Sequence, residues 1–450
     1  MFFKQPIALL AGRCLLLVLA AAFCGPASAS TAPDAALQRL LSSVNDAAVL
    51  LVDPDDNVVL DINADQTLIP ASTAKLLLAW LVLGEFGSAH QIETTFHIQR
   101  RESTVNADVS TARLWVKASG DPYLTSEELP ELARQLSVEL RNEGIRQIHG
   151  FGVDESLFDV ITEVPGGSFT RNPYDALPSA IAANFNTVVI QIENDKLIRG
   201  EPQTPVTSTT EQRAAELALF GNDSRSPDDM RERVNLGFSD QRISARYATE
   251  LLSFFLQQQG INVVNESVEF GSVPVAQELL RYRSTHRLDN IAHNMLTYST
   301  NFIANQLALV WVAALQNTPA NFEHFSRMAT QRLRQAFGWQ SFSLLDGAGL
   351  SRNNRLSARQ LVEVVDALKI YNNLLPQHRD GVRAKTGTLN GVSSLAGIID
   401  SAALPDASPD ARGFWRFAIL VNDETINDPS WREAVLSRLI DKVHRVSMEN

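Results

Sequence analysis

The stretch PASTAKLLLAW, residues 70–80, decides the fold of this chain. A proline ends the preceding pattern, and the Ala/Leu-rich run behind it predicts a helix over Ser72–Glu85 that ends near Gly87. Ser72 and Lys75 stand three residues apart at the start of this helix, so they lie on one face, a turn apart. The sequence therefore presents a serine hydroxyl beside a lysine amine at a helix N-terminus.

This Ser-x-x-Lys pair has the parts of an activated nucleophile. A serine hydroxyl is weakly nucleophilic at neutral pH and needs a base within hydrogen-bond reach. Lys75 can be that base where burial favours its neutral amine. The N–H of Ser72 has no intrahelical partner and can bind a developing oxyanion. Coincidence is the alternative, because about one or two such motifs are expected by chance in ordinary composition. The sequence contains this one only.

A second cluster, Lys385-Thr386-Gly387-Thr388, lies on the predicted strand Val382–Thr388. The charge of Lys385 and the hydroxyls of Thr386 and Thr388 make a receptor for a substrate carboxylate. Gly387 removes a side chain, so a substrate peptide can pair along the edge of the strand. The N–H of Thr388 is then a second oxyanion donor beside that of Ser72. An exposed strand with ordinary polar residues is the alternative interpretation.

The triplet Ser-x-Asn is a weaker signal because it begins three times, at Ser43, Ser299 and Ser351. Ser299-Thr300-Asn301 falls at a break in a long helical stretch, where a short loop can face a cleft. A hydroxyl there can relay a proton to a leaving amine, and the Asn301 amide can hold Lys75 and a substrate carbonyl. On the residues alone, Ser299 is favoured only modestly over Ser351, which lies in a Gly-rich turn. A solvated polar patch between two helices remains the alternative.

The N-terminal and C-terminal parts of the chain both show patterns of α-helices and β-strands. Near the N-terminus, two apolar runs flank the turn residues 53–57 and predict a β-hairpin. Near the C-terminus, helical patterns are followed by a succession of strands and an amphipathic helix. The predicted hairpin strands are Ala48–Val52 and Val58–Ile62; the C-terminal helices are Leu288–Leu315, Phe322–Phe337, Ser357–Asn372 and Pro429–Val446; the C-terminal strands are Val382–Thr388, Val392–Ile399 and Phe414–Asn422.

The middle of the chain differs, with short strands and helices between Gly/Pro/Asp turns. We predict strands at Arg113–Ala118, Thr187–Ile192 and Val263–Phe270, helices at Ser126–Glu143 and Ser244–Gln259, and a long surface loop over the polar stretch Thr204–Asp229. These patterns indicate one core, residues 30–87 and 276–450, interrupted by inserted lobes at 88–275.

Residues 1–29 have the order of a cleavable secretory signal. A basic start is followed by the apolar run Leu15–Phe23 and the small triplet that ends at Ala29, after which we predict cleavage. The alternatives are an uncleaved anchor, for which the run is short, and a lipoprotein at Cys24, where the bulky Phe23 is unfavourable. Both cysteines, Cys14 and Cys24, lie in this segment, so the mature chain is predicted to fold without disulfides.

Charge and the remaining motifs exclude several classes of function. The formal net charge is −12, and it becomes −14 once Lys4 and Arg13 are removed with the signal. That balance disfavours nucleic acid or an anionic membrane as a partner. The eight histidines form no His-Glu-x-x-His pattern, and there is no Gly-x-Ser-x-Gly elbow, Walker loop or dinucleotide fingerprint. We therefore expect no metal and no cofactor.

The three motifs stand in the order Ser-x-x-Lys, Ser-x-Asn, Lys-Thr-Gly, which is typical of β-lactamases and penicillin-binding proteins. Four stretches, residues 70–75, 120–125 (GDPYLT), 346–357 (DGAGLSRNNRLS) and 383–397 (RAKTGTLNGVSSLAG), resemble the periplasmic D-alanyl-D-alanine carboxypeptidase/endopeptidase family, the low-molecular-mass class C penicillin-binding proteins. The spacing agrees with that family, with 227 residues from Ser72 to Ser299 and 86 from Ser299 to Lys385. In β-lactamases the first gap is far shorter.

The resemblance implies a penicillin-recognising serine transpeptidase/β-lactamase-like α/β domain, an antiparallel sheet flanked by helices, with one or two inserted lobes. It implies a periplasmic serine peptidase that acts on peptidoglycan stem peptides ending in, or cross-linked through, D-Ala, and that β-lactams acylate. It selects Ser299 and Asn301 over Ser351 and Asn353. The chain departs from the family at Thr300, where Asp is usual.

Two rivals share this fold. A β-lactamase is disfavoured by the long insertion, and a non-catalytic peptidoglycan-binding scaffold is disfavoured because every position of the motif set is present.

Overall fold

The computed structural model describes residues 33–101, 111–220, 229–238, 240, 242–371, 373–405, 413–426 and 428–449. The predicted signal, residues 1–29, and both cysteines lie outside the described residues. In the parts of the chain that are described, no helix combines the length and the apolar character that crossing a bilayer requires.

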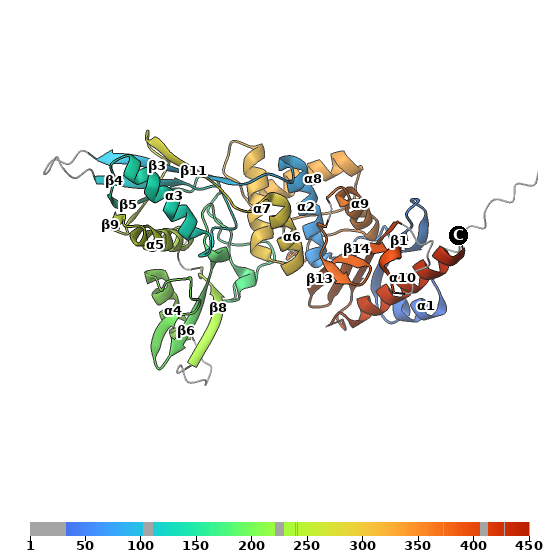
Figure 1. The fold of residues 1–450 in the computed structure, drawn as a ribbon. Coiled ribbons are helices and arrows are strands. Elements are labelled where there is room, and N and C mark those ends of the chain that lie inside the picture. Colours follow the sequence, from blue (N-terminus) through green and yellow to red (C-terminus); the bar gives the residue numbers. More distant parts are fainter. Residues whose placement is uncertain are drawn as a thin grey trace, which may run out of the picture.

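Both ends of the chain build one antiparallel sheet, in the strand order β12-β13-β14-β15-β1-β2. The N-terminal hairpin lies directly beside the C-terminal strand β15, with Val49 opposite Ile419 (Figure 1). This pairing confirms the predicted hairpin and the predicted C-terminal strands. The strands are β1 (Asp46–Val52), β2 (Val58–Ile62), β12 (Gln377–Arg379), β13 (Val382–Leu389), β14 (Val392–Asp400) and β15 (Phe414–Asn422).

Helices cover both faces of this sheet, which is why β1 is apolar on both sides. Successive side chains of a strand point to opposite faces. Leu51 thus packs in the core under α1 (Ala35–Ser42) and α10 (Ser430–Glu449). Its neighbour Leu50 belongs to the core under α2 (Lys75–Phe86) and α9 (Ala358–Leu368).

The predicted long helical stretch is confirmed with its break. It consists of α6 (Leu288–Tyr298) and α7 (Asn301–Leu315), and α8 (Phe322–Phe337) follows. The two parts separate at Ser299, whose left-handed backbone (φ 54°) ends α6. Thr300 then begins α7 as its N-cap residue.

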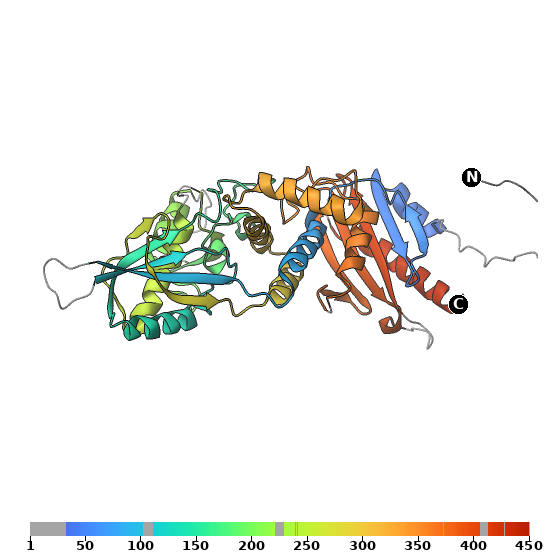
Figure 2. The ribbon, with the colours of Figure 1, turned by 90° about the horizontal axis from the view of Figure 1, so that it is seen from above.

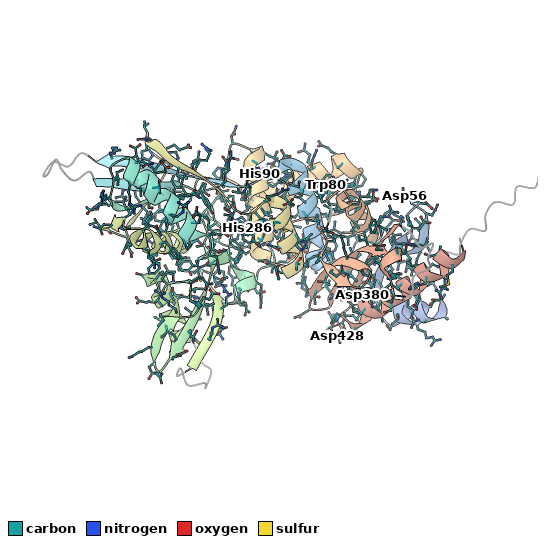
Figure 3. The ribbon with its side chains drawn as sticks, viewed as in Figure 1. Asp56, Trp80, His90, His286, Asp380 and Asp428 are labelled. Atoms are coloured by element: carbon teal, nitrogen blue, oxygen red, sulfur yellow. The ribbon has the colours of Figure 1, made fainter. Side chains whose placement is uncertain are left out.

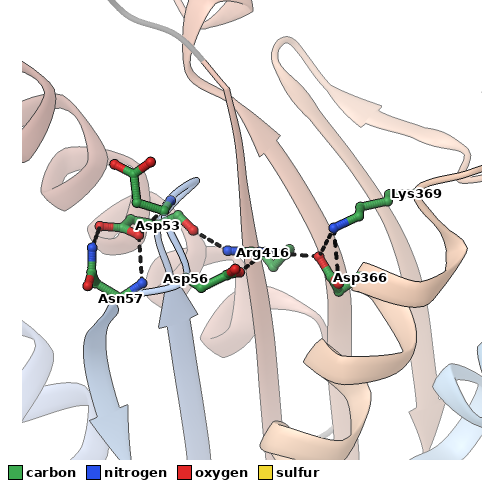
Figure 4. Close-up of polar contacts among 7 residues, drawn as sticks. Asp53, Asp56, Asn57, Asp366, Lys369 and Arg416 are labelled. Carbon is green, nitrogen blue, oxygen red and sulfur yellow. Dashed lines mark hydrogen bonds and ion pairs between the residues drawn. The ribbon is translucent and has the colours of Figure 1, made fainter.

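A buried arginine ties one end of the sheet to a turn and a helix (Figure 4). Arg416 of β15 donates to Asp56 Oδ1 in the hairpin turn (2.6 Å) and to Asp366 Oδ1 of α9 (2.9 Å). It also bonds the backbone oxygen of Asp53. Strand, turn and helix are therefore held at one point.

The middle of the chain carries two further sheets, in the orders β10-β5-β4-β3-β11, with β9 beside β5, and β7-β6-β8. They lie at the end of the molecule opposite the first sheet, with α6, α7 and α8 between (Figure 1). The strands are β3 (Glu93–Arg101), β4 (Thr111–Lys117), β5 (Gln147–Asp154), β6 (Thr187–Glu193), β7 (Lys196–Arg199), β8 (Asp229–Asn235), β9 (Asn262–Val263), β10 (Val268–Phe270) and β11 (Gln277–Arg283); the helices are α3 (Leu129–Asn142), α4 (Ser208–Phe220) and α5 (Ile243–Gln258).

The chain enters and leaves this middle region side by side, as Figure 2 shows. The N–H of Leu288 donates to His90 O at 2.7 Å, and the N–H of Ser284 donates to Ile92 O at 2.9 Å. His90 and His286, both labelled in Figure 3, lie at this crossing. Because the points where the chain leaves and re-enters the first domain are adjacent, the middle region can be inserted there without interrupting the first sheet or its helices.

Two local predictions were wrong. The first part of the expected loop Thr204–Asp229 contains α4, whose first turn is closed by hydrogen bonds between Thr207 and Thr210, and residues 221–228 lie outside the described residues. Threonine is common at helix starts as well as in loops, so the polar composition did not distinguish a helix from a loop here. The single strand expected over Val263–Phe270 is two short strands, β9 and β10, separated by a turn in which Asn265 Oδ1 accepts the N–H of Ser267.

Candidate active site

Ser72 and Lys75 meet at the start of α2. Ser72 lies in η1 (Ala71–Ala74), a 3₁₀ turn, and Lys75 is the first residue of the α-helix. Side chains at i and i+3 of a 3₁₀ turn stand in line, and the Lys75 Nζ–Ser72 Oγ distance is 2.9 Å. Ala71, just before the serine, has φ 47°. Strain of this kind is concentrated at functional sites.

The contacts of Lys75 leave its lone pair to the serine. The side chain is fully buried, and Nζ donates to Asn301 Oδ1 at 2.9 Å and to Ala348 O at 2.7 Å. Both of these oxygens can only accept. A neutral amine therefore spends its two hydrogens on them and presents its lone pair to the Ser72 hydroxyl.

Electrostatics favours that neutral state. Burial lowers the pKa of Lys75 well below its usual value, and the positive charge of Lys385 lowers it further; the carboxylate of Asp346 acts in the opposite direction. In the residues the structure describes, no carboxylate lies within ion-pair distance of Lys75. The amine is thus prepared to take a proton.

Asp346 is a site residue that sequence reasoning missed. Its buried carboxylate accepts the backbone N–H groups of residues 348–351 and the Asn354 amide, at 2.6 to 3.0 Å. This turn aims the carbonyl of Ala348 at Lys75 and, at 3.4 Å, at the hydroxyl of Ser72. The sequence marked residues 346–357 as a landmark, and the signal was an aspartate directly before a Gly-rich turn.

Ser299 contacts the second lysine. Its Oγ accepts from Lys385 Nζ at 2.8 Å, which joins Ser299 to β13. Asn301, in contrast, joins α7 to Lys75. The Lys385 side chain is 1% exposed. Burial, with a smaller contribution from the charge of Arg432, lowers the pKa of Lys385 to about 8.

Gly387 brings β13 against the nucleophile turn. A Cβ at this position would lie 2.9 Å from the N of Ser72, 2.7 Å from Pro70 O and 2.2 Å from Ser394 Oγ. The sequence explained Gly387 by the room that it leaves for a substrate. The structure gives a more direct explanation, because β13 can approach Ser72 this closely only where the strand has no side chain.

The edge of β13 is open at the motif. Strand β12 pairs with β13 only at Val382 and Arg383, and the N–H of Ala384 donates to Pro376 O, away from β14. Backbone groups alternate in direction along a strand. Those of Thr386 and Thr388 therefore point to the unpaired edge.

Gly387→Ala is expected to lower kcat/KM about 10²- to 10³-fold, as the loss of an oxyanion donor does. The added methyl group forces β13 away from the N of Ser72, so the N–H groups of Ser72 and Thr388, which the sequence predicts as oxyanion donors, separate. Gly84→Ala in α2 is the matched control, because a Cβ there meets nothing within 4 Å. Activity of the Gly387 variant within about threefold of wild type would contradict this role of the glycine.

The other Ser-x-Asn triplets lie elsewhere. Ser351 is in the Asp346 turn, where its Oγ accepts the N–H of Asn353 at 3.2 Å. Ser43 ends α1 and donates to Leu40 O at 2.7 Å. The predicted site residues form two hydrogen-bonded groups, Ser72 with Lys75 and Asn301, and Ser299 with Lys385. In the described ranges, no group of three His, Cys, Asp or Glu side chains gathers as a metal site requires.

Comparison with known families decides the class of this site. Residues 31–377 match the model of the D-Ala-D-Ala carboxypeptidase 3 (S13) family. The chain belongs to this family. Membership of the S13 family confirms the predicted resemblance and, with it, the predicted serine-type D-Ala-D-Ala carboxypeptidase. The matched range ends before the Lys385–Thr388 motif, which rests on the geometry described above.

Individual relatives agree with the S13 assignment. The penicillin-sensitive carboxypeptidase A of Dictyostelium discoideum is 23% identical over 450 residues, which is 86% of this chain and 83% of that protein. The D-alanyl-D-alanine carboxypeptidase DacB of Haemophilus influenzae is 24% identical over 395 residues, 77% and 80% of the two chains. The crystal structure of penicillin binding protein 4 (dacB) from Haemophilus influenzae has a TM-score of 0.68 at 20% identity, covering 92% of this chain and 98% of its own. The predicted penicillin-recognising fold is thereby confirmed.

Proposed function

We propose that Ser72 is the acylated nucleophile of this S13 peptidase and Lys75 its general base. The observation that carries the proposal is the contact set of Lys75, a buried amine whose hydrogens go to Asn301 and Ala348 and whose third contact is Ser72 Oγ at 2.9 Å. Lys75 takes the proton as Ser72 Oγ attacks the penultimate D-Ala carbonyl. The new Ser72–carbonyl bond gives a tetrahedral oxyanion.

The N–H groups of Ser72 and Thr388 receive that oxyanion. Support comes from the close approach of β13 to Ser72 at Gly387 and from the open edge at Thr388. Lys385, with Thr386 and Thr388, holds the terminal carboxylate of the substrate. In the residues described, Lys385 has no carboxylate partner of its own, so a substrate anion would supply the missing charge.

Collapse of the intermediate breaks the peptide bond. The proton that Lys75 took from Ser72 passes through Ser299 to the departing D-Ala amine, which returns Lys75 to its neutral form, while Lys385 keeps its charge and its hydrogen bond to Ser299 Oγ. Asn301 keeps Lys75 oriented. Water, activated by Lys75, then hydrolyses the ester on Ser72 and restores the hydroxyl. A β-lactam opened by the same attack keeps its leaving group tethered, so its adduct persists.

The substrates are peptidoglycan stem peptides ending in D-Ala and, through the same bond, peptides cross-linked by D-Ala. The names of the relatives, a penicillin-sensitive carboxypeptidase and a D-alanyl-D-alanine carboxypeptidase, support this choice and a sensitivity to β-lactams. Such substrates lie outside the cytoplasm, so residues 1–29 act as a cleaved signal and the mature chain works in the periplasm. The peptidase domain comprises residues 30–87 and 276–450, with the lobes inserted at 88–275. The strand just after this second boundary, β11, pairs with β3 of the inserted part, which supports an insertion that ends a few residues later.

Product analysis tests the proposal. The mature chain is incubated with a stem pentapeptide ending in D-Ala-D-Ala and, separately, with a D-Ala cross-linked muropeptide dimer. We expect release of D-Ala from the first, monomers from the second, and loss of both after one equivalent of bound penicillin. Binding without any product would instead identify a scaffold, and rapid turnover of penicillin would identify a β-lactamase.

The pH dependence of kcat/KM is expected to reflect the ionisation of Lys75 and of Lys385. Lys385 binds the carboxylate only as an ammonium ion, and its pKa is about 8. As the pH rises through that value the charge is lost, so kcat/KM falls, roughly tenfold per unit at higher pH. The acidic limb reports Lys75, whose lowered pKa keeps the base neutral down to lower pH.

The alkaline limb can be assigned with Lys385→Arg. A guanidinium does not lose its proton in this range, so the limb moves to higher pH in the variant even where the activity is reduced. A limb that stays in place would show that another group titrates there.

A further inference from the structure

Arg432, on the first turn of α10, contacts β13 and β14 from the face of the sheet that α10 covers. Its Nη1 donates to Gly387 O at 2.9 Å, to Thr388 Oγ1 at 2.9 Å and to Ser393 Oγ at 3.2 Å. Ser393 on β14 is the residue opposite Thr388 on β13. One guanidinium nitrogen therefore binds both strands at the level of Thr388.

The alternation of side chains explains why this contact comes from α10. Lys385 and Gly387 face the nucleophile side of the sheet, where Lys385 meets Ser299 at the junction of α6 and α7 and a Gly387 Cβ would meet the N of Ser72 in η1. Thr388, one residue on, faces α10. The residue proposed as both oxyanion donor and carboxylate ligand is thus held from the far side of the sheet, by Arg432.

The charge of Arg432 is poorly neutralised. The residue is 6% exposed, and within the described ranges its ion-pair partner is Glu433, 3.5 Å from Nε. Glu433 is itself shared with His378, whose Nε2 lies 3.1 Å from both carboxylate oxygens. Burial lowers the pKa of Arg432. A buried cation without a close counter-ion makes its surroundings favourable to an anion.

That positive potential extends to the substrate side. The charge of Arg432 lowers the pKa of Lys385, which places the two cations within electrostatic reach of each other. Both are buried, and neither is matched by a buried carboxylate among the described residues.

We propose that Arg432 is a positioning and specificity-determining residue for the substrate carboxylate. It fixes Thr388 through the Gly387 carbonyl and the Thr388 hydroxyl, so that the backbone of Thr388 keeps its place at the open edge of β13, and it adds its charge to that of Lys385. The inference rests on the proposed function and names the residue by which that site selects a free C-terminal carboxylate over a neutral end.

Two thioesters of one N-acyl-D-alanine test the inference. Their leaving groups are mercaptoacetate, which carries a carboxylate, and mercaptoacetamide, which is neutral and nearly the same shape. Both are activated acyl donors, so wild-type turnover of each is measurable. Arg432→Gln is expected to lower kcat/KM for the acid about 10- to 100-fold, mainly through KM, which is the range for hydrogen bonds to charged groups. For the amide the expected change is less than about threefold.

Matched variants show whether Arg432 selects the substrate carboxylate or only supports the local structure. Arg432→Lys keeps a point charge without the fork and should keep part of the preference for the acid. In Arg432→Gln/Thr388→Val the two losses should be less than additive, because the residues act together. Arg438→Gln, an exposed arginine of the same helix paired with Asp441, is the control and should leave both rates unchanged.

The outcomes are distinct. Equal losses on both thioesters, or no loss on either, would overturn the role of Arg432. Should Arg432→Gln not fold, the ratio measured on Arg432→Lys decides in the same way. A wild-type chain that turned over neither thioester would contradict the proposed function itself.

Discussion

Ser72→Ala is expected to abolish D-Ala release, with a loss of about 10⁴-fold or more in kcat/KM, and to end covalent labelling by penicillin. The variant loses the atom that forms the acyl bond. It retains Lys75, the oxyanion donors and Lys385, so substrate binding is expected to survive. The rate of D-Ala release and in-gel labelling with a fluorescent penicillin measure the two effects.

The control for this variant is Ser43→Ala. Ser43 begins another Ser-x-Asn triplet, but its hydroxyl only closes the end of α1. It should label and turn over like the wild type. Labelling that persisted in Ser72→Ala at wild-type stoichiometry would refute the assignment of the nucleophile.

Lys75→Met is expected to slow acylation about 10³- to 10⁴-fold, in the upper range for a general base. Methionine fills the same buried volume but cannot take the proton of Ser72. The rate constant for penicillin acylation, followed under single-turnover conditions, reports this step alone.

Two further variants show whether the loss belongs to the base. Lys75→Arg keeps a cation that does not deprotonate, so it should be as slow as Lys75→Met. Lys369→Met removes an exposed lysine bonded to Asp366 and should acylate at the wild-type rate. Acylation by Lys75→Arg within about tenfold of wild type would mean that charge, and not proton transfer, is what Lys75 supplies.

Much of the site follows from local sequence. Ser72 and Lys75 are three residues apart, and a helical turn of either kind brings their side chains together, so their contact was predictable. The break at Ser299 was also predictable from the polar triplet between two apolar helical patterns. In each case the deciding interaction spans only a few residues.

The remaining contacts join segments that are far apart in the chain. Lys385 binds Ser299 across 86 residues, and the carbonyl of Ala348 meets Lys75 across 273. Sequence spacing does not give such distances, because the packing of β13 and of the Asp346 turn against η1 sets them. The contacts of Arg432 were equally out of reach, since they depend on which face of β13 carries Thr388.

The site of the penicillin adduct tests the central claim most directly. The mature enzyme is labelled to completion, digested, and its peptides are sequenced by mass spectrometry. We predict one adduct per chain, carried by Ser72. An adduct on Ser299 or Ser351, or an unmodified Ser72 in fully labelled protein, would contradict the account.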